Sequence, residues 1–356
     1  MNLLITGGCG FIGSNFIRLS LNDPANNGLH IFNLDALTYA GNPENLKDLP
    51  AGRHELIEGN ICDSALVLYL LRRHQVDAIV HFAAESHVDR SIDAPAAFVQ
   101  TNVAGTLSLL EAALAYWNEV KAGPKSNFRF LHVSTDEVYG SLEPTGPPFT
   151  ESSRYCPSSP YAASKAASDH LARSFHHTYG LPVLVSNCSN NYGPYQFPEK
   201  LMPLMILNAL ERKPLPIYGR GDNIRDWLYV EDHCRALTLI LKQGRPGETY
   251  LIGGECERNN IEIVDALCGV LNQLAPGEDA FDYKQLKTFV TDRQGHDKRY
   301  AMNISKIRRE LGWQPLEQLQ TGLRLTVEWY LKHRDWCENI AQNRYQRQRL
   351  GLGQQT

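Results

Sequence analysis

A glycine cluster near the start of the chain constrains the fold more than any other feature. Residues 3–6, Leu-Leu-Ile-Thr, have the composition of a buried strand. Gly7, Gly10 and Gly13 follow in a G-x-x-G-x-x-G spacing as a helical pattern begins. Glycines permit a tight turn and a close approach of the backbone to a bound group, and a helix N-terminus offers N–H groups to an anion. The segment therefore predicts a strand–turn–helix unit that binds the pyrophosphate of a dinucleotide.

An acidic residue at the end of the second predicted strand indicates which dinucleotide is bound. Asp35 stands 22 positions after Gly13. A carboxylate in this place accepts hydrogen bonds from the adenosine ribose hydroxyls and repels a 2′-phosphate. We therefore expect NAD rather than NADP. The segment 60–63 follows the third strand, where the adenine is expected to lie.

Apolar runs and helical patterns alternate through the first half of the chain. Strands are predicted at 3–6, 30–34, 78–83, 128–134 and 183–188, and helices at 13–21, 64–73, 97–117 and 161–179. Several of these strands are apolar throughout, as in a parallel sheet that is covered on both faces. The pattern predicts an α/β fold with a Rossmann-type, doubly wound parallel sheet.

The sequence pattern changes beyond about residue 190, where prolines and glycines separate shorter predicted elements. Helices are predicted here at 261–274, 305–311 and 322–336. We therefore expect an NAD-binding domain at 1–188, with a return to it near 226–250. A smaller, irregular α/β substrate-binding domain is expected at 189–356.

The composition excludes several classes of function. The formal net charge of −4 gives no overall field that attracts nucleic acid. The start of the chain has no secretory-leader pattern and no apolar stretch approaches the ~18 residues of a membrane span, so we expect a cytoplasmic protein without a membrane partner. The eight cysteines are scattered and predict buried, reduced thiols. His87, His233 and His296 fit no metal-binding spacing, so no metal is expected.

A tyrosine and a lysine four positions apart are the first candidates for catalysis. Tyr161 and Lys165 lie in a helical pattern, so their side chains share one helix face. A neighbouring ammonium is expected to lower the tyrosine pKa toward neutrality, which allows the phenolate to take a hydroxyl proton during hydride transfer. Upstream, the polar residues 134–137, Ser-Thr-Asp-Glu, close an apolar strand. That is the end of a parallel strand at which open α/β sheets bind ligands.

Taken together, these motifs resemble those of the extended short-chain dehydrogenases that act on nucleotide sugars. Within that family, the segment 135–140, Thr-Asp-Glu-Val-Tyr-Gly, is similar to the Thr-Asp-Glu run of the dTDP-glucose 4,6-dehydratases. The likeness extends through almost the whole chain and is carried by the segments 83–91, 101–102, 189–200, 218–227, 292–297 and 311–313.

The resemblance implies a redox elimination on dTDP-glucose with NAD as the cofactor. Tyr161, beside Lys165, would take the proton of the sugar 4-hydroxyl as a hydride leaves C4. Glu137 would then take the C5 proton, Asp136 would protonate the departing 6-hydroxyl, and Thr135 would hold the 4-hydroxyl. Adjacent carboxyl groups suit this step if their environments push their pKa values apart.

The resemblance also implies two sets of binding residues. The cofactor contacts beyond the glycines and Asp35 are Phe11, Ile12, Leu37, Thr38, Asn60, Ile61, Phe82, Ala83, Ala84, Ser86, Thr101, Tyr161, Lys165 and Asn190. The substrate contacts are Ser86, Thr135, Asn190, Lys200, Arg225, Asn260, Asp292, Arg293 and His296. Arg225 and Arg293 are expected to hold the substrate phosphates, because a guanidinium fork matches phosphate oxygens. A homodimer built on the helical segments 97–117 and 161–179 is also implied.

Two positions depart from the family pattern. Asn60 stands where the family usually has an aspartate near the adenine, so the contact there is expected to be weaker or altered. Gln294 replaces the usual proline of an Arg-Pro-Gly-His-Asp segment, which predicts a looser substrate loop.

Three other functions fit part of the pattern. A UDP-hexose 4-epimerase shares the glycines and the Tyr–Lys pair, but it needs no elimination pair such as Asp136 and Glu137. A GDP-mannose 4,6-dehydratase usually prefers NADP, which Asp35 disfavours, and lacks this Thr-Asp-Glu run. A catalytically silent NAD-binding regulator typically loses the tyrosine or the lysine, and this chain has both.

Overall fold

A seven-stranded parallel sheet forms the centre of the fold. The computed structural model describes residues 1–123, 126–277, 281–343 and 345. The strand order is β10-β6-β5-β4-β1-β2-β3, and every neighbouring pair is parallel. The strands are β1 (Asn2–Thr6), β2 (His30–Asp35), β3 (His54–Glu58), β4 (Ala78–His81), β5 (Arg129–Thr135), β6 (Val183–Cys188) and β10 (Thr249–Ile252). This confirms the predicted α/β fold class.

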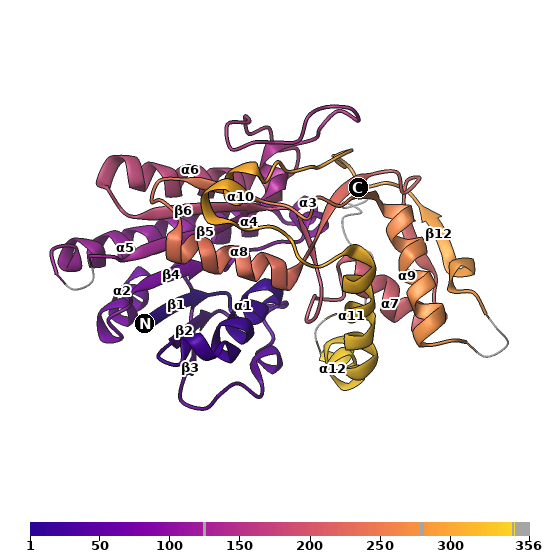
Figure 1. The fold of residues 1–356 in the computed structure, drawn as a ribbon, viewed down its shortest axis with the longest axis horizontal. Coiled ribbons are helices and arrows are strands. Elements are labelled where there is room, and N and C mark those ends of the chain that lie inside the picture. Colours follow the sequence, from indigo (N-terminus) through magenta and orange to yellow (C-terminus); the bar gives the residue numbers. More distant parts are fainter. Residues whose placement is uncertain (124–125, 278–280, 344, 346–356) are drawn as a thin grey trace.

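Helices cover both faces of this sheet (Figure 1). On one face lie α1 (Phe11–Asn22) and α8 (Val230–Gln243), which share a buried cluster with Leu3 and Ile5 of β1. On the other face lie α2 (Ser64–Arg73), α5 (Thr106–Val120) and α6 (Pro160–Tyr179), which share a cluster with Leu4. Leu3, Leu4 and Ile5 point alternately to opposite faces and are all apolar, because neither face meets water there. We call this part the sheet lobe.

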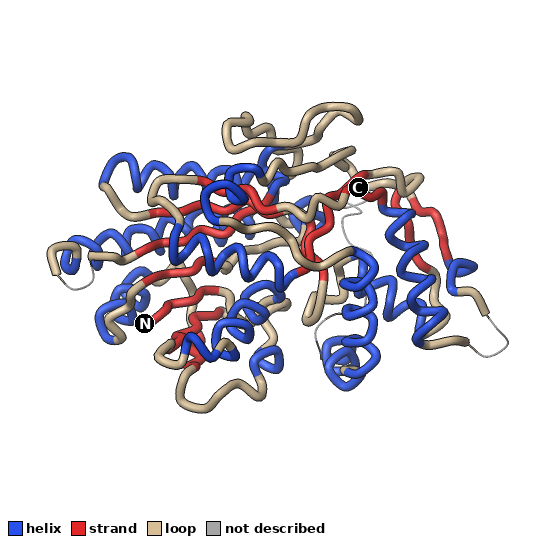
Figure 2. Tube along the Cα trace, viewed as in Figure 1, coloured by secondary structure: helices blue, strands red, loops and turns tan. Residues whose placement is uncertain are grey.

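A second group of elements packs around its own apolar cluster. Two small sheets carry short strands: β7 (Asn190–Tyr192), β9 (Ile224–Tyr229) and β11 (Glu257–Asn259) in one, β8 (Leu215–Tyr218) and β12 (Lys287–Val290) in the other. The helices are α7 (Leu201–Leu210), α9 (Asn260–Leu274), α11 (Leu319–Lys332) and α12 (Arg334–Asn343). Their apolar faces form one buried cluster. We call these helices and the two small sheets the helical lobe. Figure 2 shows its helices beside the edge of the larger sheet lobe.

The chain passes between the two lobes more than once. After β9, helix α8 and strand β10 belong to the sheet lobe, where β10 pairs with β6. Helix α10 (Ser305–Leu311) also packs there through Ile307, before the chain reaches α11. The division of the sequence into domains at 188/189 stays a prediction.

The predicted helices at 64–73 and 305–311 are confirmed residue for residue. The single helix predicted over 97–117 is instead α4 (Pro95–Phe98), a π-helical turn η3 (Val99–Gly105) and α5. The strand predicted over 78–83 ends at His81, because the backbone leaves the sheet toward the site.

Two further observations concern the cysteine thiols and the possibility of a membrane-spanning helix. The expectation of buried thiols is wrong for Cys156, which is exposed, while Cys62 and Cys256 are half-buried. None of the helices in the described ranges combines the length and apolar character that a bilayer crossing requires.

Candidate active site

The glycine turn forms a closely packed cradle at the end of β1. Gly7 has a φ of 73°, and a Cβ atom there would lie 2.6 Å from the backbone of Ala83. A Cβ at Gly13 would lie 2.5 Å from the carbonyl oxygen of Gly7. Gly10 caps α1 without a side-chain hydrogen bond, and Phe11 and Ile12 form the first helical turn. The residues therefore fit the pyrophosphate of a dinucleotide, because the backbone can approach it and the helix N-terminus faces it.

Asp35 is fixed at the carboxyl end of β2, beside this turn. Its carboxylate accepts hydrogen bonds from the backbone N–H groups of Cys9 (2.8 Å) and Leu37 (2.9 Å). Leu37 has a φ of 49°, which is unusual for a leucine, and Thr38 follows it in the loop. The structure thus places the predicted ribose-binding carboxylate next to the pyrophosphate cradle.

The candidates after β3 and β4 lie along the same edge of the sheet. The side-chain oxygen of Asn60 accepts a hydrogen bond from the N–H of Cys62 (2.9 Å), and Ile61 is buried. Phe82, Ala83, Ala84 and Ser86 form the loop that leaves β4. All of them follow the carboxyl ends of parallel strands, which is why residues so distant in sequence come together.

The π-helical turn that contains Thr101 and Asn102 holds the loop after β4 in place. The amide of Asn102 bonds both backbone groups of Glu85, accepting from its N–H (2.9 Å) and donating to its carbonyl (3.0 Å). The same amide donates to the Ser164 hydroxyl on α6 (2.9 Å). Asn102 therefore couples the cofactor loop to the helix that carries the catalytic candidates.

The acidic pair lies where β5 ends and a 3₁₀ turn, η4 (Asp136–Tyr139), begins. The Thr135 hydroxyl accepts from the N–H of Glu137 (3.3 Å) and donates to Asp136 (3.2 Å). Burial, followed by the charge of Glu137, raises the pKa of Asp136 well above its ordinary value. Its Oδ2 atom has no hydrogen-bond partner among the described residues. Burial therefore favours the protonated form of Asp136, and one of its oxygens is left for another group.

Three cations surround the second carboxyl of the pair. Burial also raises the pKa of Glu137, but the charges of Arg293, Lys200 and Arg225 oppose this effect. Asp136 and Glu137 thus differ in their surroundings, since Asp136 lies deeper and Glu137 faces the cations. Such a difference allows one carboxyl group to act as an acid and its neighbour as a base.

Tyr161 and Lys165 come from the first turns of α6, as expected. Tyr161 is buried and meets the ring of Phe98 edge-on at 6.2 Å. The Lys165 ammonium donates to the carbonyl of Val133 (3.0 Å). The expected lowering of the Tyr161 pKa is wrong for the protein by itself. Burial, followed by the charge of Glu137, raises it well above 10, although a hydrogen bond with Thr135 opposes the rise.

The charges of both predicted phosphate-binding arginines, Arg225 and Arg293, act on Glu137 of the acidic pair. The buried guanidinium of Arg225 stacks 4.3 Å from the ring centroid of Tyr300 and donates to the carbonyl of Asp297 (2.9 Å). Arg293 meets the carboxylate of Asp89 at 3.5 Å, and its buried Nε has no partner in the described part of the chain.

The remaining substrate candidates line the same region. Lys200 donates to the carbonyl of Ser86 (2.8 Å). The side-chain oxygen of Asn190 is buried and unpartnered within the described ranges, which suits a group waiting for a ligand. Asn260 opens α9, and His296 meets Asp292 at 2.6 Å.

Comparison with known proteins decides the family. The family model described as GDP-mannose 4,6 dehydratase matches residues 4–326. The dTDP-glucose 4,6-dehydratase of Xanthomonas campestris pv. campestris (strain B100) is 55% identical over 349 residues, 98% of each chain. The chain belongs to the dTDP-glucose 4,6-dehydratase family.

Solved structures agree with this membership. The structure of DesIV, a dTDP-glucose 4,6-dehydratase of Streptomyces venezuelae with NAD bound, has a TM-score of 0.85 and 47% identity, covering 96% of this chain and 100% of that one. The UDP-glucose 4-epimerase of Thermotoga maritima matches with a TM-score of 0.79 but only 28% identity, over 93% of this chain and 99% of that one. The epimerase shares the fold, whereas the dehydratase family shares half of the sequence as well.

Several residues of this dehydratase-family site were not among the candidates predicted from sequence. Asp89 accepts from the Tyr218 hydroxyl (2.9 Å) as well as meeting Arg293, so it holds a predicted phosphate ligand. His87 caps helix α3 (Val88–Asp93), and burial lowers its pKa to about 2. Asp89 and His87 lie inside the segment 83–91, whose likeness to the family was the signal that could have found them.

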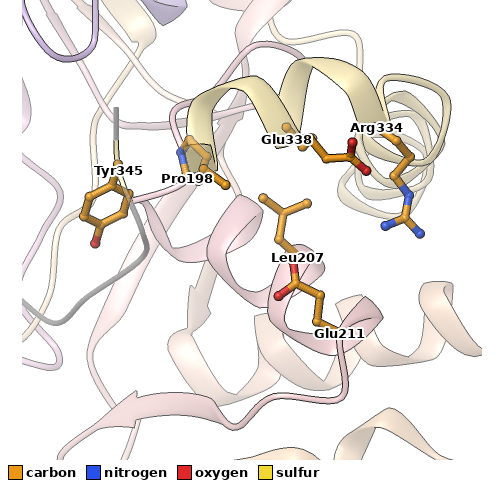
Figure 3. A pocket seen from close by; sticks show the side chains of 8 residues that line it. Pro198, Leu207, Glu211, Arg334, Glu338 and Tyr345 are labelled. Carbon is orange, nitrogen blue, oxygen red and sulfur yellow. The ribbon is translucent and has the colours of Figure 1, made fainter. Parts of the chain in front are cut away.

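Two cavities among the described residues are lined by other residues than the predicted site residues. One of about 170 Å³ lies beside α7 and α12, and Figure 3 shows its lining. It is lined by Pro198, Leu207, Glu211, Arg334, Cys337, Glu338, Ala341 and Tyr345. A second, of about 440 Å³, borders Asp226, Glu257 and Met302. None of the predicted site residues lines either cavity.

Proposed function

We propose that the protein is an NAD-dependent dTDP-glucose 4,6-dehydratase. It converts dTDP-glucose to dTDP-4-dehydro-6-deoxyglucose and water, which makes it a hydro-lyase. The observation that carries the proposal is the adjacent pair Asp136 and Glu137 in two different surroundings, next to Tyr161. An epimerase needs the tyrosine but has no use for a paired acid and base.

The residues around the glycine turn would hold the cofactor. The cradle of Gly7, Gly10 and Gly13 takes the pyrophosphate, and Asp35 takes the adenosine ribose. NAD⁺ held there would supply an acceptor for the hydride of C4, a donor of that hydride to C6, and a positive charge that favours the phenolate of Tyr161, which burial and Glu137 disfavour.

The first chemical step belongs to Tyr161 and Thr135. Tyr161 takes the proton of the 4-hydroxyl as the C4 hydride departs, so that C4 becomes a ketone. The Thr135 hydroxyl holds the same sugar oxygen, because it lies at the end of β5 and bonds with Tyr161. Lys165 contributes a buried positive charge on the same face of α6.

The second step is the loss of water across C5 and C6. The new ketone acidifies the C5 proton, which Glu137 removes as a base. Asp136, held protonated by burial, gives its proton to the 6-hydroxyl, which leaves as water. A C5–C6 double bond remains. The returning hydride adds to C6, and C5 regains a proton from Glu137 or Tyr161, both of which took up a proton in the earlier steps.

Substrate binding would rest on cations that face the acidic pair. Arg225, Arg293 and Lys200 act on the charge of Glu137, so a diphosphate bound to them keeps the sugar within reach of that carboxyl group. The polar contacts proposed around these cations are Ser86, Thr135, Asn190, Asn260, Asp292 and His296.

We also propose a cytoplasmic homodimer whose sequence divides into domains near residue 188. Helices α5 and α6 lie together on one face of the sheet, and exposed apolar side chains, Val99 and Tyr179, flank them. Sedimentation of the purified protein as a monomer would contradict the dimer, and recovery of the native protein in a membrane or secreted fraction would contradict the location.

The test of the reaction uses dTDP-glucose labelled with deuterium at C4. We expect a product lighter by one water, with the deuterium at C6, as measured by mass spectrometry and NMR. A product that is an isomer of unchanged mass would show that the protein is an epimerase and not a dehydratase. If no turnover occurs, with UDP- and GDP-sugars also supplied, the result would favour a catalytically silent NAD-binding regulator.

A further inference from the structure

A buried polar network lies directly beneath the catalytic turn, and the reaction described above makes no use of it. Its centre is Asp169 on α6, whose side chain is fully buried. One carboxylate oxygen lies 3.0 Å from His132 Nε2 on β5. The other accepts hydrogen bonds from the Tyr155 hydroxyl (2.8 Å) and from the Asn187 amide (2.9 Å) on β6. Such a concentration of buried polar groups has a high energetic cost unless every member is paired.

The network reaches the catalytic lysine along α6. Asp169 follows Lys165 by four positions, so both side chains share one face of the helix. Burial lowers the pKa of Lys165, and the charge of Asp169 is the first effect that opposes this lowering. Lys165 otherwise donates to a backbone carbonyl, that of Val133.

The network also reaches the turn that carries the acid and the base. The Asn187 amide, which donates to Asp169, also donates to the carbonyl of Thr135 (3.1 Å). Thr135 is the last residue of β5, and Asp136 follows it in the chain. A carboxylate at position 169 therefore fixes, through one amide, the backbone from which the acidic pair projects.

We propose that Asp169 is a positioning residue for the dehydration reaction. Its carboxylate is the buried counter-charge that keeps Lys165 protonated beside Tyr161, and it anchors the Thr135 turn through Asn187. The inference deepens the proposed function and rests on it.

The charge of Lys165 acts on Asp169 alongside several other titratable groups. Burial acts to raise the pKa of Asp169, but the hydrogen bond with His132 and the charge of Lys165 bring it below its ordinary value. Burial, followed by Lys165, lowers the pKa of His132, so this imidazole is neutral at neutral pH. The remaining titratable groups near the network are His81 on β4, Tyr139 on η4, Tyr155, His170 and Arg173 near or on α6, and Cys188 on β6.

Two variants separate the charge of Asp169 from its hydrogen bonds. Asp169→Asn keeps the shape and still accepts from Tyr155 and Asn187, but it removes the charge. Tyr155→Phe removes one hydrogen bond to the same carboxylate and keeps the charge. Both are compared with the wild-type protein by single-turnover reduction of bound NAD by dTDP-glucose across pH.

We expect Asp169→Asn to slow the hydride transfer at least about tenfold, with little change in KM. The loss of the carboxylate lowers the pKa of Lys165. The alkaline limb of the pH profile should therefore move to lower pH by at least about one unit. Tyr155→Phe should stay within about threefold of wild type, with the alkaline limb unmoved. A purely structural role would lower the amount of active protein without moving that limb.

The outcomes are distinguishable. A wild-type protein without turnover overturns the proposed function itself. An active wild type with an unchanged pH profile in Asp169→Asn overturns only this inference. If that variant does not fold, the double variant Asp169→Asn, Lys165→Met removes both buried charges. Recovery of folding in the double variant supports the pairing of the Asp169 and Lys165 charges. If neither variant folds, that pairing is overturned.

Discussion

At the scale of single residues, the chemistry depends on one carboxyl group lying deeper than its neighbour. Glu137 faces three cations and also raises the pKa of Tyr161. Glu137→Gln should therefore have two effects. Elimination at C5 should slow by at least about 100-fold, because the base is gone. The acid limb of hydride transfer should move to lower pH, because the phenolate of Tyr161 then forms more easily and activity is lost only at a lower pH. Stopped-flow measurement of NADH and product across pH checks both.

Asp136→Asn is the matched control for this pair. It removes the acid that protonates the leaving hydroxyl, so product formation should slow as well. Its charge has a smaller effect on the pKa of Tyr161 than burial or Glu137 has, and burial favours the protonated form of Asp136. The acid limb of hydride transfer should therefore stay near its wild-type position. A Glu137→Gln protein that forms product at the wild-type rate would contradict the assignment of the base.

At the scale of elements, the sequence predicted what local pattern determines and missed what distant partners determine. The apolar run of β6 and the caps of α2 are local, and both elements lie where expected. Strand β3 has the sequence His-Glu-Leu-Ile-Glu at the edge of the sheet, which gives no clear apolar run. The strands β7, β9 and β11 are short and far apart in sequence, so only the folded chain shows that they pair.

The same distinction applies to the site. Gly13, Asp35, Tyr161 and Lys165 stand in recognisable spacings, and the structure brings them to one edge of the sheet. Asp169 carries no motif of its own, because its role depends on partners contributed by β5 and β6. Spacing along the sequence shows which residues share a helix face. It does not show which strand supplies the hydrogen-bond partners of a residue such as Asp169.

The glycine turn allows a test at the scale of an element. A Cβ at Gly13 would lie within 2.8 Å of backbone atoms of Gly7 and Gly8, which cannot move aside easily. Gly13→Ala should lower the free energy of unfolding by about 1–3 kcal/mol and reduce the NAD retained through purification. Gly28→Ala is the control, since no atom lies within 4 Å of its added Cβ, and it should stay within about 0.5 kcal/mol. Equal urea midpoints and NAD contents would contradict the packed cradle.

At the scale of the whole molecule, one buried carboxylate secures the segment that joins the lobes. Asp232 lies on α8 in the sheet lobe, and its two oxygens accept from the backbone N–H groups of Leu316 and Glu317, each at 2.9 Å. Its backbone carbonyl accepts from the Trp313 indole (3.1 Å), and its side chain pairs with Arg235. Residues 313–318 lead directly to α11 of the helical lobe. Asp232 therefore sets where the helical lobe is attached.

Asp232→Asn offers one acceptor oxygen in place of two and removes the negative charge that pairs with Arg235. We expect the free energy of unfolding to fall by about 1–3 kcal/mol, because a partly buried N–H group loses its acceptor. The KM for dTDP-glucose should rise while the bound NAD is retained, since the cofactor cradle lies wholly in the sheet lobe. Glu231→Gln is the neighbouring control, because that side chain is exposed and should change stability by less than about 0.5 kcal/mol. If the two variants match in urea unfolding and in KM, the joining segment is held by apolar packing of Trp313 rather than by Asp232.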